Sequence, residues 1–204
     1  MSDDLARRNA SAHQIVEPPF SVATEIAGPL PSTTSKKRKV RRLVPMPPGI
    51  HAGELHKAAR SYIGAARKLE QGRQQFLSPR YFLLCHGLEL GLKAFLAANG
   101  DRWSMLMGLG HDLNASYKRA QVEYGFQPAE PLLNKVIELM SPEHKKQLFR
   151  YPGTVWLELP GSDQCCDVID GLLDQISGGV DEVRGLTTFR MRLENLAPDP
   201  NRIE

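Results

Sequence analysis

Three polar residues share one face of a segment that is otherwise apolar. His86, Glu89 and Lys93 are three and four residues apart, and side chains at that spacing meet on a helix. In one interpretation, the imidazole, carboxylate and ammonium groups line a catalytic or ligand-binding site. In the other, Glu89 and Lys93 form a structural ion pair that fixes how helices pack, with His86 hydrogen-bonded nearby. The sequence leaves both interpretations open.

A second polar pair, His111 and Asp112, follows the glycine-containing segment 108–110. The imidazole either caps the helix that follows or orients Asp112, whose carboxylate is favoured by the free amides of a first helical turn. Alternatively, both residues bind an anion or a metal ion. No further cluster of His, Cys or Asp completes a metal set along the sequence. We therefore predict neither a metal ion nor another cofactor.

Helices must position these residues, and the sequence predicts about five. Apolar side chains recur every three or four residues, which indicates amphipathic helices. The second helix is apolar on nearly every side, which is typical of a central helix, and Ser78 is its candidate N-cap. The predicted fold is an all-α helical bundle with short connections, to which residues 154–159 add at most one short strand. The expected helices cover residues 54–76, 80–99, 112–124, a stretch from 131 that ends near 142 or continues irregularly through 149, and 163 to about 186.

The last expected helix carries an acidic face opposite its apolar side. We expect this face to be simply solvated. The adjacent Cys165 and Cys166 point about 100° apart on a helix, so we expect only one of them to be buried. With Cys85 they make an odd number of cysteines, which suits neither a disulfide framework nor paired zinc ligands, so all three are expected to be reduced. The acidic residues are Asp163, Asp167, Asp170, Asp174 and Asp181.

The beginning of the chain differs from the rest in composition. Residues 1–50 contain seven of the 15 prolines and carry a net charge of +4, whereas residues 51–204 carry a net charge of −1. Without a sustained apolar period, the first segment cannot offset its ordering entropy. We expect a disordered tail over 1–48, a helical domain over 49–197 and a short tail over 198–204. The near-neutral domain argues against a large basic surface for nucleic acid.

The positive charge of the tail is concentrated in one basic run. The run resembles a nuclear localisation signal, but short basic runs are common in tails that contact phosphate groups, and we interpret it as solvated or weakly phosphate-binding. No apolar run reaches the ~18 residues of a membrane span, and the acidic start lacks the pattern of a secretory signal. A cytoplasmic chain that does not bind membranes is expected. The basic residues are Lys36, Lys37, Arg38, Lys39, Arg41 and Arg42.

Three motifs, in this order, resemble those of the HEPN domain family. They are Leu77-Ser78-Pro79 through His86-Gly-Leu-Glu89-Leu-Gly-Leu-Lys93-Ala94-Phe95-Leu96, then Gly110-His111-Asp112-Leu113, then Phe149-Arg150-Tyr151-Pro152. The similarity covers about residues 51–185. HEPN domains are all-α modules that bind nucleotides or are related to ribonucleases. The candidate ligand-binding residues are Glu89, Lys93, His111, Asp112, Arg150 and Tyr151.

HEPN ribonucleases resemble one another in an arginine that is followed, after four to six residues, by a histidine late in the bundle, with the site completed across a dimer. The resemblance implies that the arginine stabilises phosphate charge and that the imidazole assists attack by a 2′-hydroxyl group. Arg150 lies in the late region, but no histidine follows it. Within the expected helical domain, Arg80 and His86 match the spacing, but a helix places them about 120° apart, and we interpret this match as coincidence. The candidate catalytic residues are His86, Arg80 and Arg150.

Three hypotheses of function follow from the residues and the resemblance. The first is a non-catalytic HEPN-like binding module, working as a homodimer in a bacterial stress, defence or toxin–antitoxin setting. The second is a metal-independent endoribonuclease that uses Arg80 or Arg150 with His86 or His111. The third is a nucleotide-binding partner of a nucleotidyltransferase, with Lys93, Arg150 and His111 at the ligand. RNA or a nucleotide is the expected ligand, and a nucleotidyltransferase or an antitoxin is the expected partner.

Overall fold

The computed structural model describes residues 46–69, 77–150 and 158–196, and in this part of the chain all regular structure is helical. The prediction of an all-α helical bundle is confirmed. The expected disordered tail up to residue 45, with its basic run, lies outside the described residues, as does most of the expected strand. The elements are α1 (Pro48–Lys68), α2 (Leu77–Ala98), α3 (Trp103–Gly108), α4 (Leu113–Tyr124), α5 (Leu133–Lys145), the 3-10 turn η2 (Leu148–Arg150) and α6 (Ser162–Leu196).

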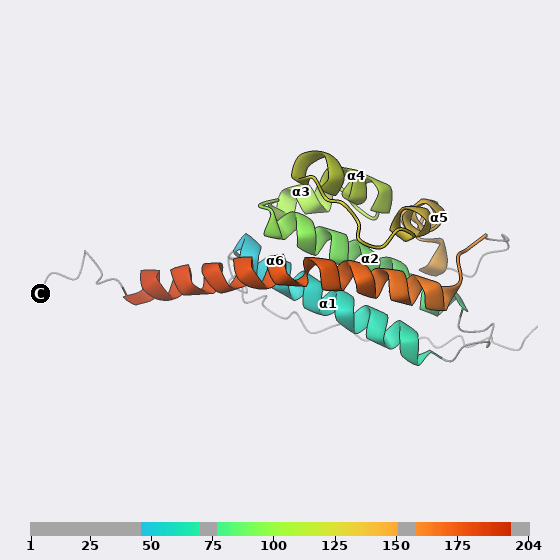
Figure 1. The fold of residues 1–204 in the computed structure, drawn as a ribbon, viewed down its shortest axis with the longest axis horizontal. Helices are drawn as coiled ribbons and strands as arrows, with labels where there is room; N and C mark the ends of the chain where they lie inside the picture. Colours follow the sequence, from blue (N-terminus) through green and yellow to red (C-terminus); the bar gives the residue numbers. More distant parts are fainter. Residues whose placement is uncertain (1–45, 70–76, 151–157, 197–204) are drawn as a thin grey trace, which may run out of the picture. The chain divides into compact units, whose positions relative to one another are not determined.

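The helix α2 lies at the centre of the bundle. Figure 1 shows α1 and α6 alongside it on one side and α3, α4 and α5 on the other. Its side chains Leu84, Leu88 and Leu92 are almost completely buried. Within the described residues, α2 is the one helix long and apolar enough to cross a membrane, and 67% of its apolar window is buried inside the bundle. Most of this window is therefore covered by the other helices, and α2 packs as the core helix of the bundle.

Glycines let α1 approach its two neighbours closely. A Cβ atom at Gly87 of α2 would lie 2.6 Å from Cδ1 of Ile63. A Cβ atom at Gly49 of α1 would lie 2.7 Å from the carbonyl oxygen of Val183 in α6. Real Cβ contacts are longer than these distances, so both positions exclude a larger side chain while the backbones stay where they are.

Arginines from α1 pair with the acidic face of α6. Arg67 Nη2 lies 2.8 Å from Asp167 and 2.7 Å from Asp170, and Arg60 pairs with Asp170 and Asp174. The expectation that this face is simply solvated therefore holds only in part, because Asp167 and Asp174 remain 73% exposed but both pair with arginines of α1. The sequence pattern showed which face of α6 was acidic, but not that arginines of α1, at least 100 residues earlier, would lie against it.

Both adjacent cysteines of α6 are buried, although only one was expected to be. Cys165 Sγ lies 3.8 Å from the sulfur of Met140 in α5, and Cys166 Sγ lies 4.0 Å from Arg80 in α2. The start of α6 is thus covered from two sides, which the 100° between neighbouring side chains does not prevent. Burial raises the pKa of Cys165 to about 12, so this thiol stays protonated at neutral pH.

Several helix ends differ from the prediction. The helix α1 begins at Pro48 rather than at residue 54, because a proline is tolerated at the first helical position. The hydroxyl of Ser78 donates to the carbonyl of Phe149 and lies inside α2, so it is not an N-cap. The short helix α3 was not predicted. At the other end, α6 continues through Gly178 and Gly179 to Leu196, ten residues beyond the expected end.

Candidate functional site

The carboxylate of Glu89 gathers polar side chains from three parts of the fold. Its side chain is almost fully buried, at 3% exposure. Lys93 Nζ donates to Oε1 at 2.6 Å, within α2. On the other oxygen, Oε2, His144 Nε2 lies at 2.7 Å and His111 Nδ1 at 3.0 Å. The predicted pair of Glu89 and Lys93 therefore exists, and the structure adds two imidazoles to it.

The hydrogen bonds keep Glu89 charged despite its burial. Burial alone would raise the pKa of this carboxyl, but the hydrogen bonds from His144, Lys93 and His111 outweigh burial and lower the pKa to about 2. The buried Glu89 carboxylate and the buried Lys93 ammonium neutralise each other's charge. The Lys93 ammonium also donates to the carbonyl of Gly110 at 2.8 Å, so two of its three N–H groups are used within the fold.

His111 enters this site from the loop that precedes α4. It does not cap the helix, as one interpretation had it; Asp112 is the N-cap and accepts a hydrogen bond from the amide of Ala115. Lys145 lies 2.7 Å from the second oxygen of Asp112 and, as the largest cause, lowers the pKa of that carboxyl. The side chain of His111 is 33% exposed, so the buried network reaches solvent through it.

His86 lies beside the network without a hydrogen bond to it. Its Nδ1 atom is buried, has no hydrogen-bond partner among the described residues, and is 3.9 Å from Glu89 Oε2. The rings of Tyr62 and Phe82 cover the imidazole, with centroids at 4.5 and 5.8 Å. Burial lowers the pKa of His86, and the attraction of Glu89 does not reverse this effect. Burial therefore favours the neutral form of this imidazole.

The two candidate arginines have different surroundings. Arg80 is buried and donates to the carbonyl of Ala66, to Ser162 and to Asp163, so its guanidinium joins α2 to α1 and α6. The spacing of Arg80 and His86 thus corresponds to no shared site, as the helical geometry predicted. Arg150 is exposed, and its guanidinium carbon lies 5.3 Å from the centroid of the Phe82 ring, which stacks on His86.

One member of the network, His144, was missed by the sequence analysis. It lies in the last turn of α5, on the row that contains the buried Ile137 and Met140. A histidine at a core position of an amphipathic helix is a signal that the sequence did contain. Its partner was not visible, because 55 residues separate it from Glu89. The candidate ligand residue Tyr151 and the basic run at 36–42 lie outside the described residues.

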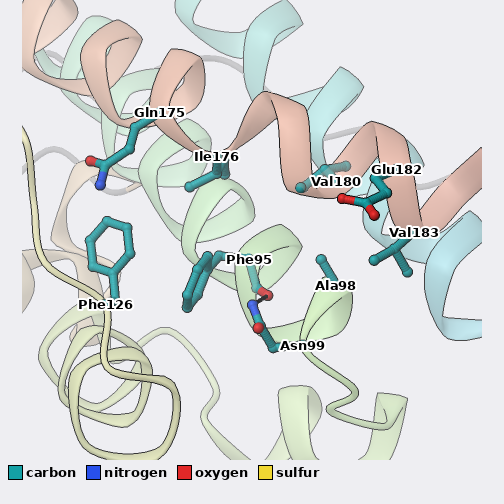
Figure 2. A pocket seen from close by; sticks show the side chains of 10 residues that line it. Phe95, Ala98, Asn99, Phe126, Gln175, Ile176, Val180, Glu182 and Val183 are labelled. Carbon is teal, nitrogen blue, oxygen red and sulfur yellow. Dashed lines mark hydrogen bonds between the residues drawn. The ribbon is translucent and has the colours of Figure 1, made fainter.

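A separate pocket lies between α2 and α6, closed on one side by Phe126. Its volume is about 260 Å³. Figure 2 shows Phe95 and Ala98 of α2 facing Val180 and Val183 of α6 across it. None of the residues predicted to bind a ligand lines this pocket. Its walls are largely apolar, with polar groups such as Asn99, Gln175 and Glu182 at the edge.

Known proteins offer no guide to this site, because no family model, no curated protein and no solved structure matches the chain. The geometry must be interpreted by itself. A buried carboxylate that holds one oxygen toward two imidazoles, one of them partly exposed, can orient an imidazole for proton transfer or take part in binding a cation. The second oxygen is neutralised by Lys93, so the site offers little to an anion.

Proposed function

We propose that this chain is a non-catalytic, HEPN-like helical binding module that works as a homodimer, in the stress, defence or toxin–antitoxin setting that the resemblance implies. The observation that carries the proposal is the C-terminal part of α6. Figure 1 shows this part extending past the other helices. Its side chains Leu186, Phe189 and Leu193 are more than half exposed, at 63%, 61% and 52%. Exposed apolar residues that form one stripe mark an interaction surface.

The apolar stripe continues a row that begins at the pocket. Gly179 and Glu182 line the pocket, and Leu186, Phe189 and Leu193 follow them at spacings of three and four residues. Such alternating spacing is the pattern of a helix that packs lengthwise against another helix. Figure 2 shows Glu182 at the pocket edge, next to Val183. The surface to be covered therefore runs from the pocket to the end of the helix.

The charges at the end of α6 favour a second copy of this chain, packed antiparallel, as the partner that covers the stripe. Before the centre of the stripe, Asp181 and Glu182 outnumber Arg184, which pairs with Asp181. After the centre, Arg190 and Arg192 outnumber Glu194. Antiparallel pairing centred on Leu186 brings the acidic end of one copy against the basic end of the other. Parallel pairing would place the arginines of the two copies together. The same antiparallel pairing lays Phe189 and Leu193 of one copy over the pocket of the other.

The proposal is tested by the mass of the full-length chain in solution. Light scattering is expected to give twice the chain mass of 22.7 kDa for the wild type and a single chain mass for Leu186→Ser with Phe189→Ser. Val122→Ser, which removes a 69% exposed valine from α4, serves as the matched control and is expected to stay dimeric. Glu182→Arg and Arg190→Glu should each weaken the dimer, and the two together should restore it. A wild-type monomer, or a dimer indifferent to the stripe, would contradict the proposal.

A ribonuclease is the second candidate, and one observation favours it. Glu89 holds Nδ1 of His111, and the partly exposed ring can present its other nitrogen to solvent, as a general base requires. Against it, Arg80 is committed to structural contacts and no histidine follows Arg150. Degradation of RNA by the full-length chain in EDTA, abolished by His111→Ala or Arg150→Ala, would establish this candidate instead. We expect no cleavage above background.

A further inference from the structure

We propose that Glu89, His111 and His144 bind a divalent transition-metal ion, of which Zn²⁺ is the representative. The three potential ligand atoms, Glu89 Oε2, His111 Nδ1 and His144 Nε2, all lie within 4.8 Å of one another. Metal bonds of about 2.0–2.2 Å in a tetrahedral site place ligand atoms roughly 3.3–3.5 Å apart. The oxygen lies 2.7 and 3.0 Å from the two nitrogens, so it would move slightly away from both, while the two nitrogens, which lie within 4.8 Å of each other, would keep their separation or approach to reach that geometry.

The chemistry of the three donors matches such an ion. Two imidazoles and one carboxylate suit zinc and its neighbours in the transition series, whereas calcium and magnesium prefer oxygen ligands alone. Three protein ligands leave a fourth position open. His111 is 33% exposed, which provides the path by which an ion and a water molecule enter. The three ligands come from α2, from the loop before α4 and from the end of α5, so a bound ion would join all three.

A second observation points to a missing group at the same place. Nδ1 of His86 is buried, has no hydrogen-bond partner in the described part of the chain, and lies 3.9 Å from the oxygen that would bind the ion. An orphaned buried polar atom costs free energy, and such atoms in native structures call for a partner. A water molecule on the open position of the metal is a suitable partner, because it can donate to this nitrogen.

Lys93 orients the carboxylate of the proposed site through its other oxygen atom. It holds Oε1 at 2.6 Å and leaves Oε2 to the metal, in the way that hydrogen bonds around a metal centre orient its ligands. The ammonium also repels a dication, which favours an ion that binds through strong imidazole bonds over one held by charge alone. Binding requires each imidazole to carry its proton on the nitrogen that does not contact the carboxylate, which is Nε2 in His111 and Nδ1 in His144. In His111 solvent can exchange this proton because the ring is partly exposed.

Cobalt is the appropriate probe, because Co²⁺ takes zinc sites and absorbs visible light. The full-length protein, stripped of metal with a chelator and then dialysed, is titrated with Co²⁺. We expect one ion per chain and the intense visible bands of a four- or five-coordinate site, without the near-ultraviolet band of a cobalt–thiolate bond, since the ligands are not cysteines. Addition of Zn²⁺ should remove the bands by displacement and should raise the midpoint of thermal unfolding.

Variants separate this site from binding elsewhere. His111→Asn changes the partly exposed ligand and should fold, and we expect it to weaken Co²⁺ binding at least tenfold. His51→Asn, which changes a histidine outside the cluster, is the matched control and should bind as the wild type does. Glu89→Gln should also lose the bands. Absence of visible bands in the wild type, or bands of equal strength in His111→Asn, would overturn the proposal. A monomeric stripe variant should still bind Co²⁺, which distinguishes this inference from the proposed dimer.

Discussion

His144 Nε2 lies 2.7 Å from the carboxylate of Glu89, although 55 residues separate the two in the chain. This contact ties the last turn of α5 to the middle of α2. It also turns a pair within one helix into a network between helices, because His111 reaches the same oxygen from the loop before α4. The network is therefore part of the packing as well as a candidate site.

Glu89→Gln tests how much the fold depends on this carboxylate. The change leaves the Lys93 ammonium buried without its counter-charge, and we expect a loss of about 3–5 kcal/mol in the free energy of unfolding. Urea unfolding in the presence of EDTA measures it. Glu138→Gln, at an exposed pair with Lys135, is the control and should change stability by less than about 0.5 kcal/mol. Equal effects of the two substitutions would show that the network around Glu89 adds nothing to the stability of the fold.

Arg80→Met tests whether the buried arginine is a structural residue. The variant loses hydrogen bonds to Ala66, Ser162 and Asp163, and hydrogen bonds to charged groups contribute about 1.5–3 kcal/mol each. We expect clear destabilisation in thermal or urea unfolding. Arg150→Met, which removes an exposed guanidinium from Phe82, should lose at most about 1 kcal/mol. A stable Arg80→Met protein would contradict the assignment of Arg80 to packing.

Gly87→Ala tests the close approach of α1 and α2. The added methyl group would lie 2.6 Å from Cδ1 of Ile63, and overpacking of this kind costs about 1–3 kcal/mol. Ile63→Val removes that Cδ1 atom. The double variant should therefore be less destabilised than the sum of the two single changes, which a double-mutant cycle by urea unfolding measures. Simple additivity would show that the two residues do not touch.

Asp101 gives the fold a dependence on acid pH. Hydrogen bonds from Arg119, and then from Tyr124, lower the pKa of this carboxyl against the opposing effect of burial. Its folded pKa lies below the ordinary value of about 3.9, so its contribution is complete above that value and is lost as the pH falls through the folded pKa. We expect Asp101→Asn to destabilise the protein at pH 7 and to differ less from the wild type near pH 3. The exposed Glu123→Gln is the control for urea unfolding at both values.

The sequence predicted what depends on neighbours along a helix and missed what depends on neighbours in space. Apolar spacing identified α2 as the central helix, and Gly125 correctly ended α4, where its φ of 64° favours glycine. The spacing of Glu89 and Lys93 predicted their pair. The two imidazoles on Glu89 could not be predicted, because they reach it through the packing of separate elements.

The acidic face of α6 shows the same limit. The aspartates were recognised, but their arginine partners lie at least 100 residues earlier in the chain. Solvation was the simplest expectation for each residue by itself. Whether an acidic face also contacts guanidinium groups depends on which helix packs beside it. The spacing of residues within a single helix does not encode that neighbour.

The contact between the first and last helices bears on how the protein forms during synthesis. The helices α1 and α2 pack against each other, and α6 covers both of them. Until α6 has been synthesised, a nascent chain therefore exposes the apolar surface that Cys165, Ile169 and Leu172 later bury. Chains that expose such surface before they are complete are prone to aggregation. Folding of this domain is consequently expected to be completed only after α6 has been synthesised.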